Sequence, residues 1–185
     1  MKTIKNSLIL LTITILTITF HYQAAAQLKY YKGYVIPLKG DTLKGEIESN
    51  PKKEIDHFRK IKYRARAGMP TKGFIAGKIK EYKMDSTIFI SRKIDDQDVF
   101  IKLIVPGKIN IYEGRTEDVD GKEVTLLPDY FYLKGEETVL VQDKPSRFKK
   151  QMMALMADNT AIVKAIADDT YTYSNVLELF KAYNK

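Results

Sequence analysis

The segment from Gly33 to Ile47 constrains the fold most, because its pattern is typical of a β-hairpin. Gly40 and Asp41 form the expected two-residue turn, in which glycine suits the first central position. This register brings apolar residues and glycine to one face and most polar residues to the other, as the two-residue side-chain period of strands requires. The apolar face would hold Tyr34, Ile36, Leu38, Leu43, Gly45 and Ile47.

Two residues of the hairpin carry further expectations. Gly45 on the apolar face leaves room for a large neighbouring side chain or for a sharp bend of the strand. Pro37 has no backbone N–H, so we expect a sheet edge or a β-bulge on its side of the ladder.

Alternating strand patterns continue to about residue 141, after which apolar residues recur at helical spacing. We therefore predict an α+β fold, with a mostly antiparallel, strongly bent β-sheet or partly closed barrel over residues 30–141. Two or three helices would follow within residues 145–185. Their apolar stripes would be Phe148, Met152, Leu155 and Met156; Ile162, Val163 and Ile166; and Val176, Leu177, Phe180 and Tyr183.

Residues 1–26 have the pattern of a secretory signal peptide. Lys2 and Lys5 precede a run of 13 mainly apolar residues from Leu8 to Phe20, and three alanines before Gln27 fit a cleavage site. A membrane-spanning helix needs about 20 apolar residues, so we predict cleavage rather than retention as an anchor. The mature chain would be a single domain, residues 27–185, without a transmembrane span. It would be exported to the periplasm, the outer-membrane periphery or the extracellular space.

The residue types of common catalytic and metal sites are scarce. The chain has no Cys, and His57 is the one His beyond the signal segment. Triads based on His and metal sites of the His/Cys kind therefore lack candidates, and we predict no catalytic residue, no metal and no cofactor. His57 lies in a charged stretch, where we expect an ordinary surface or strand-start residue. A carboxylate-dependent hydrolase of a cell-wall or sugar polymer stays open as an alternative.

Charge is distributed unevenly along the chain. Residues 52–83 hold eleven Lys and Arg against three acids, a net of +8, whereas residues 113–143 hold three against nine, a net of −6. Within the basic part, Lys60, Lys62, Arg64 and Arg66 alternate with less polar residues, which predicts the outer face of a half-buried strand. Such a face is a candidate contact for an anionic partner. A solvated face that pairs with the acidic half, or that protects an edge strand, explains the same pattern.

Three stretches resemble parts of uncharacterised secreted proteins from Bacteroidetes-type Gram-negative bacteria. They are the hairpin from Gly33 to Ile47, the segment from Phe100 to Tyr112, and the C-terminal Leu179-Phe-Lys-Ala-Tyr-Asn184. The resemblance implies an envelope location and a β-rich domain with C-terminal helices, and it carries no activity. The hairpin is also similar to those of small SH3-like and Sm-like barrels, which is an analogy of fold alone.

These observations favour an exported cell-envelope protein that acts as a non-enzymatic binding or accessory module. Its partner would be an anionic envelope component or another envelope protein, and the signal segment argues against nucleic acid. The candidate contact residues are Lys60, Lys62, Arg64 and Arg66. Besides the hydrolase, a structural subunit that associates through its sheet edges is an alternative.

Overall fold

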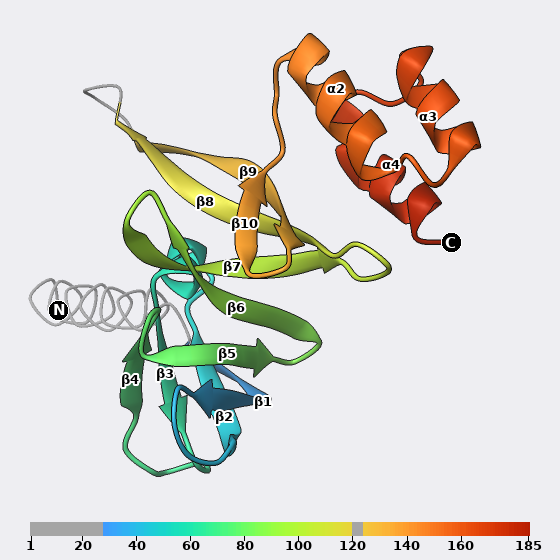
Figure 1. Ribbon diagram of the computed structural model, residues 1–185. Helices are drawn as coiled ribbons and strands as arrows, with labels where there is room; N and C mark the ends of the chain where they lie inside the picture. The colour runs from blue at the N-terminus through green and yellow to red at the C-terminus, as the bar shows by residue number, and fades with distance from the viewer. Residues whose placement is uncertain (1–27, 120–123) are drawn as a thin grey trace, which may run out of the picture.

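In the computed structural model, which describes residues 28–119 and 124–185, one antiparallel sheet precedes a group of helices (Figure 1). The strand order is β10-β9-β8-β7-β6-β5-β1-β2-β3-β4, so the sheet is open at both ends. The predicted α+β fold with a bent sheet is confirmed. The strands are β1 (Lys29–Pro37), β2 (Leu43–Ser49), β3 (Lys60–Arg64), β4 (Lys72–Ile75), β5 (Ile79–Met84), β6 (Thr87–Ile94), β7 (Gln97–Val105), β8 (Ile111–Val119), β9 (Val124–Lys134) and β10 (Glu137–Leu140).

The predicted hairpin exists as β1 and β2, but its predicted register is wrong. Val35 lies opposite Leu43 and Gly33 opposite Gly45, so the loop spans residues 38–42 rather than two residues. Val35 is fully buried while Leu38 is 49% exposed. The alternation of apolar and polar residues predicted the wrong register because β1 lies inside the sheet, between β5 and β2. Its residues are therefore partly buried on both faces.

The expectations for Pro37 and Gly45 are confirmed. The pairing of β1 with β5 shifts register between Ile36 and Pro37, which is a bulge at the residue that cannot donate. A Cβ at Gly45 would lie 2.6 Å from the Tyr63 ring and would overlap the Arg64 carbonyl, so glycine here makes room for a large neighbour.

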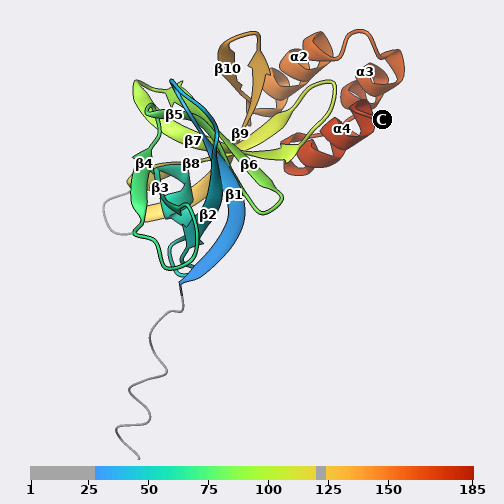
Figure 2. The same cartoon turned by 90° about the horizontal axis from the view of Figure 1, so that it is seen from below.

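The first five strands form a strongly curved part of the sheet (Figure 2). They enclose an apolar core to which a short 3₁₀ helix, η1 (Glu54–Phe58), contributes Phe58. Phe58 of η1 packs edge-on against Phe89, and Tyr82 stacks on the same Phe89 ring at 4.6 Å between centroids. The hydroxyl of the buried Tyr82 donates to the His57 carbonyl at 2.7 Å. These contacts fix η1, and with it the His57 ring, inside the N-terminal half.

The helices lie at the other end of the molecule, beside β7 to β10 (Figure 1). They are α2 (Pro145–Leu155), α3 (Thr160–Ala167), the short η2 (Tyr173–Asn175) and α4 (Val176–Tyr183). Their predicted stripes are confirmed in the main, since Phe148, Met152, Ile166 and Phe180 are at most 1% exposed. Asn159 is the N-cap of α3, and its side chain accepts a hydrogen bond from the backbone N–H of Ile162.

Asn184 joins the end of the chain to the turn between β7 and β8, and we call this contact the C-terminal lock. Its Oδ1 accepts from the Ile109 N–H at 3.1 Å, and its Nδ2 donates to the Ile109 carbonyl at 2.9 Å. Gly107 lies against the same side chain, where any Cβ would overlap it. Beside it, the Tyr183 hydroxyl donates to Asp158 at 2.6 Å, and Lys108 pairs with the same carboxylate.

Candidate functional site

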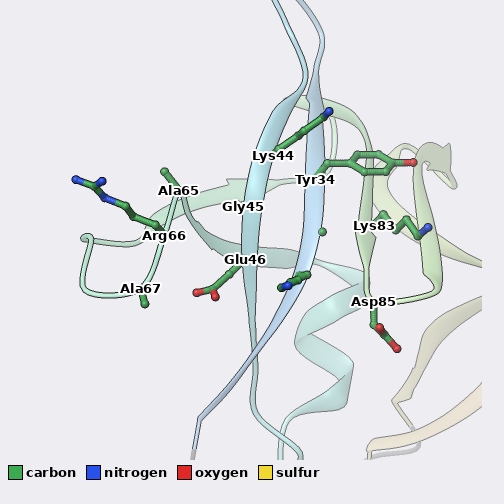
Figure 3. Close-up of a pocket in the computed structure, with 11 residues that line it drawn as sticks. Tyr34, Lys44, Gly45, Glu46, Ala65, Arg66, Ala67, Lys83 and Asp85 are labelled. Atoms are coloured by element: carbon green, nitrogen blue, oxygen red, sulfur yellow. The ribbon is translucent and has the colours of Figure 1, made fainter.

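A hollow of about 600 Å³ opens where Gly33 of β1 lies opposite Gly45 of β2 (Figure 3). A Cβ at Gly33 would overlap the Lys83 carbonyl of β5, and a Cβ at Gly45 would overlap the Arg64 carbonyl of β3. The two glycines therefore let the backbones of four strands approach closely. Ala65 and Ala67 continue the wall with small side chains. We call this the glycine hollow.

Charged residues of the glycine hollow come from β1, β2, the loop after β3, β5 and the turn after β5. Lys44 extends from β2, Lys83 from β5 and Arg66 from the loop after β3 (Figure 3). Lys32 of β1 is the fourth cation. The carboxylates at the hollow are Glu46 and Asp85.

Glu46 is already held by its neighbour on β3. Its Oε2 accepts from the Arg64 Nε at 2.6 Å, and the Arg64 guanidinium lies over the Tyr30 ring at 3.3 Å from the centroid. The side chains of Arg64 and Glu46 are 18% and 26% exposed, so the pair is half-buried. The Glu46 charge is thereby compensated inside the sheet, which leaves four cations against Asp85 around the hollow.

Tyr34 forms a second polar contact on this face. Its hydroxyl donates to Glu81 at 2.5 Å, and this hydrogen bond raises the pKa of Tyr34 to about 12. The phenol therefore stays neutral at physiological pH, and Glu81 is engaged by it rather than by a lysine of the hollow.

The four predicted contact residues are not brought together on one free surface. Arg64 is paired with Glu46, and Arg66 lies beyond the strand at the rim of the glycine hollow. Lys62 pairs with Glu48 at 2.9 Å, and this hydrogen bond raises the Lys62 pKa. Lys60 lies with Lys62 beside a separate cavity of about 250 Å³.

Sequence reasoning missed Lys32, Lys44 and Lys83 as possible contact residues. Lys32-Gly33 and Lys44-Gly45 are both Lys–Gly dipeptides, and the true register places their glycines opposite each other. Lys83 joins them because β5 pairs with β1 across a long sequence separation. The two dipeptides were a usable signal, but their meaning depends on a register that the hairpin pattern assigned wrongly.

The expectation for His57 was wrong, because the residue is only 7% exposed. Its Nε2 lies 3.1 Å from the Ser49 Oγ, whereas its Nδ1 is buried and has no hydrogen-bond partner among the described residues. Burial lowers the pKa of His57, and the nearby charges of Asp56 and Glu54 oppose this effect only in part. The ring is therefore neutral over a wider pH range than a surface His.

The hairpin and the C-terminal stretch, on which the expected resemblance was based, both make folding contacts. The hairpin supplies Gly33 and Gly45, and the C-terminal stretch closes the lock on the turn after β7. Searches of protein-family models, curated proteins and solved structures found no match to this chain. In the part of the chain that the structure describes, no group of three or more His, Cys, Asp or Glu residues is placed to hold a metal ion.

Proposed function

We propose that this protein is an exported cell-envelope binding module and that the glycine hollow receives an anionic group of an envelope component. The observation that carries the proposal is that Lys32, Lys44, Arg66 and Lys83 line one hollow together with Gly33 and Gly45. Clustered cations at a concave surface raise the local concentration of anions.

The ion pair between Glu46 and Arg64 favours anion binding over the alternative of carboxylate-based hydrolysis. A glycosidase needs two carboxyl groups that face one cleft and remain available to the substrate. At the glycine hollow, Glu46 is paired with Arg64, so Asp85 is the one carboxylate of the lining that Arg64 does not hold. The same arrangement shifts the local balance of charge towards an anionic ligand.

The alternative of a structural subunit depends on the open edges of the sheet. Ile75 of β4 is 53% exposed and Leu140 of β10 is 42% exposed, which favours edge association. However, the Gln151 side chain donates to the Leu140 carbonyl at 2.8 Å and occupies part of the β10 edge. Sedimentation velocity tests this candidate, because edge pairing predicts dimers or longer assemblies at micromolar concentration, and a strictly monomeric protein contradicts it.

Binding to vesicles of phosphatidylglycerol and phosphatidylcholine tests the main proposal. We expect binding that rises with the phosphatidylglycerol fraction and weakens between 50 and about 500 mM salt, because salt screens exposed charges. A variant with K32Q, K44Q, R66Q and K83Q should bind at least about tenfold more weakly, given about 1 kcal/mol for each cation near an anionic surface. Unchanged binding of this variant would contradict the assignment of the hollow.

Lys62, which lies on the predicted basic face and pairs with Glu48, provides a control in the N-terminal half. A K62Q variant removes a cation that Glu48 already compensates, so we expect a smaller loss of vesicle binding than for K44Q alone. An equal or greater loss would indicate that β3, rather than the glycine hollow, forms the contact surface.

Export can be tested independently of the ligand. Expression of the full chain in a Gram-negative host, followed by cell fractionation and N-terminal sequencing, should yield a product that begins at Gln27 outside the cytoplasm. A cytoplasmic product that retains Met1 would contradict the proposed location.

A further inference from the structure

The first half of β1 has a neighbouring strand on one side only. β2 pairs with β1 over residues 29–35, whereas the pairing with β5 begins at Gly33, opposite Met84. Beyond Met84 the chain turns away from β1 at Asp85, and β1 continues past this turn (Figure 3). Residues 29–32 therefore form a short open edge within the sheet, and we call it the β1 edge.

A backbone hydrogen bond at the end of the paired region shows which groups face the β1 edge. The Lys32 carbonyl points towards the β5 side, because it accepts from the Asp85 N–H at 2.8 Å. Backbone groups point to the same side of an antiparallel strand at every second residue, so the N–H and the carbonyl of Tyr30 face the same way. In the described part of the chain, no strand pairs with Tyr30 on that side and no backbone group binds these two atoms there. The β1 edge is therefore a template for one more strand.

A cavity of about 260 Å³ lies beside this edge. Its lining includes Tyr31 of β1 together with Met84 and Thr87, which flank the turn after β5. Phe58 and Phe89 belong to the same lining. A residue of an added strand opposite Tyr31 would share its face of the sheet and would lie next to the cavity. The volume is below the roughly 300–1,000 Å³ of pockets for drug-sized ligands, so it suits one large side chain.

Charge at the β1 edge indicates which kind of strand it fits. Lys29 and Lys32 flank the edge, both are exposed, and neither forms an ion pair among the described residues. Acidic residues at the ends of an added strand would complement them. Glu54 and Asp85 belong to the cavity lining, so an apolar residue suits the cavity itself better than a carboxylate. A second copy of this chain would bring lysines against lysines, which disfavours pairing of two β1 edges.

We propose that the β1 edge binds an extended acidic segment of another protein as an added strand, with one apolar side chain of that segment in the cavity. In this mode of recognition, main-chain hydrogen bonds give affinity and a side-chain pocket gives specificity. The proposal does not depend on anion binding at the glycine hollow, because the backbone of Tyr30 carries it. Lys32 belongs to both sites.

Amide hydrogen exchange, followed by nuclear magnetic resonance of protein with labelled tyrosine, tests this proposal. The Y30F and Y31F variants identify the two signals by their absence, and the probe is the peptide acetyl-Asp-Val-Thr-Phe-Thr-Val-Asp-amide. We expect the Tyr30 amide to exchange quickly in the free protein and at least about tenfold more slowly with saturating peptide. The Tyr31 amide faces β2 and should be protected in both states.

Matched peptides and variants separate strand addition from attraction by charge alone. N-methyl groups on both Thr residues of the peptide remove the donors that would face β1, and Ala in place of its Phe removes the anchor. Each change should weaken binding at least about tenfold. The K29Q variant should bind the acidic peptide about two- to fivefold more weakly, the effect of one exposed ion pair, while K134Q on β9 should bind it normally.

Four results would overturn the proposal. The Tyr30 amide could already be protected in dilute free protein, or the acidic peptide could give no protection up to millimolar concentration. Equal protection by the N-methylated peptide, or by one with Lys in place of both Asp residues, would exclude an added acidic strand. Protection of Tyr30 that rises with protein concentration in the absence of peptide would assign the β1 edge to a second copy of this chain.

Discussion

One polar cluster at each end of this molecule shows a different use of polar residues. At the C-terminal end, Asn184 satisfies the backbone of the turn after β7, and Asp158 binds both Tyr183 and Lys108. At the N-terminal end, four cations surround the glycine hollow, and a buried ring nitrogen of His57 has no partner among the described residues. The polar residues named at the C-terminal end are therefore used by the fold itself.

This difference separates residues that hold the structure from residues available to a ligand. The conspicuous C-terminal sequence, with its Tyr-Asn ending, belongs to the first group because each polar atom discussed above contacts another part of the chain. Lys32 and Lys44 belong to the second group, although nothing in their immediate sequence distinguishes them from other surface lysines. The following variants test this separation, beginning with the largest expected effect.

Phe180→Ala should damage the C-terminal end most. Phe180 is fully buried among the helices, and removal of a buried Phe side chain typically costs about 3–5 kcal/mol of unfolding free energy. Urea denaturation followed by circular dichroism measures this loss. If the comparison holds, the variant binds anionic vesicles normally under conditions where it is folded. A loss below about 1 kcal/mol would contradict the role of α4 in the core.

Asn184→Ala should have a smaller effect on the same end. The change leaves the Ile109 N–H and carbonyl without the side chain that binds both, and we expect a loss of about 1–3 kcal/mol. Urea denaturation again gives the value, with K185A as a control at the adjacent exposed residue. Equal stability of the two variants would show that the lock contributes nothing.

His57 should make stability fall as the pH falls. Its folded pKa is lowered below the ordinary 6.5 by burial, so the unfolded chain takes up a proton that the folded chain resists. Stability from this group is therefore fully present above pH 6.5 and declines below it, down to the folded pKa. Thermal unfolding between pH 8 and pH 5 should show a weaker dependence in H57Q than in the wild type. Parallel curves would contradict a buried neutral imidazole.

Lys62→Gln should have the smallest effect on stability. Its partner Glu48 is well shielded, but the Lys62 side chain is 57% exposed, and exposed ion pairs contribute about 0–1 kcal/mol. We expect a change below about 0.5 kcal/mol, measured by urea denaturation at low and high salt. A loss as large as that of N184A would mean that the β2–β3 ion pairs hold the N-terminal half together.

The sequence predicted the elements of the fold better than their pairing. Local patterns identify the helical stripes around Phe148 and Phe180, because helical periodicity depends on neighbouring residues alone. The register of β1 failed because Val35 and Ile36 are both at least partly buried, so alternation within the strand carries no clear signal. The lock of Asn184 on Ile109 joins residues 75 positions apart, which no local pattern reports.

The candidate site was predicted only in part for the same physical reason. Strand alternation correctly placed Lys60 and Lys62 on an outer face, and it also brought Arg66 to attention. It could not reveal that Glu46 and Glu48 of β2 lie beside this face and pair with Arg64 and Lys62. Cations that are free to meet a ligand can be told from paired ones only when the neighbouring strand is known.

We propose that the cations of the glycine hollow bind anions, whereas those of the C-terminal end do not. Two variants with the same loss of charge test it in one vesicle-binding assay. One carries K32Q, K44Q, R66Q and K83Q at the hollow, and the other carries K134Q, K150Q, K181Q and K185Q at exposed sites of β9, α2, α4 and the C-terminus. We expect the first variant to lose at least about tenfold in affinity for phosphatidylglycerol vesicles and the second to lose less than about threefold. Equal losses would contradict the claim, because binding would then depend on net charge alone.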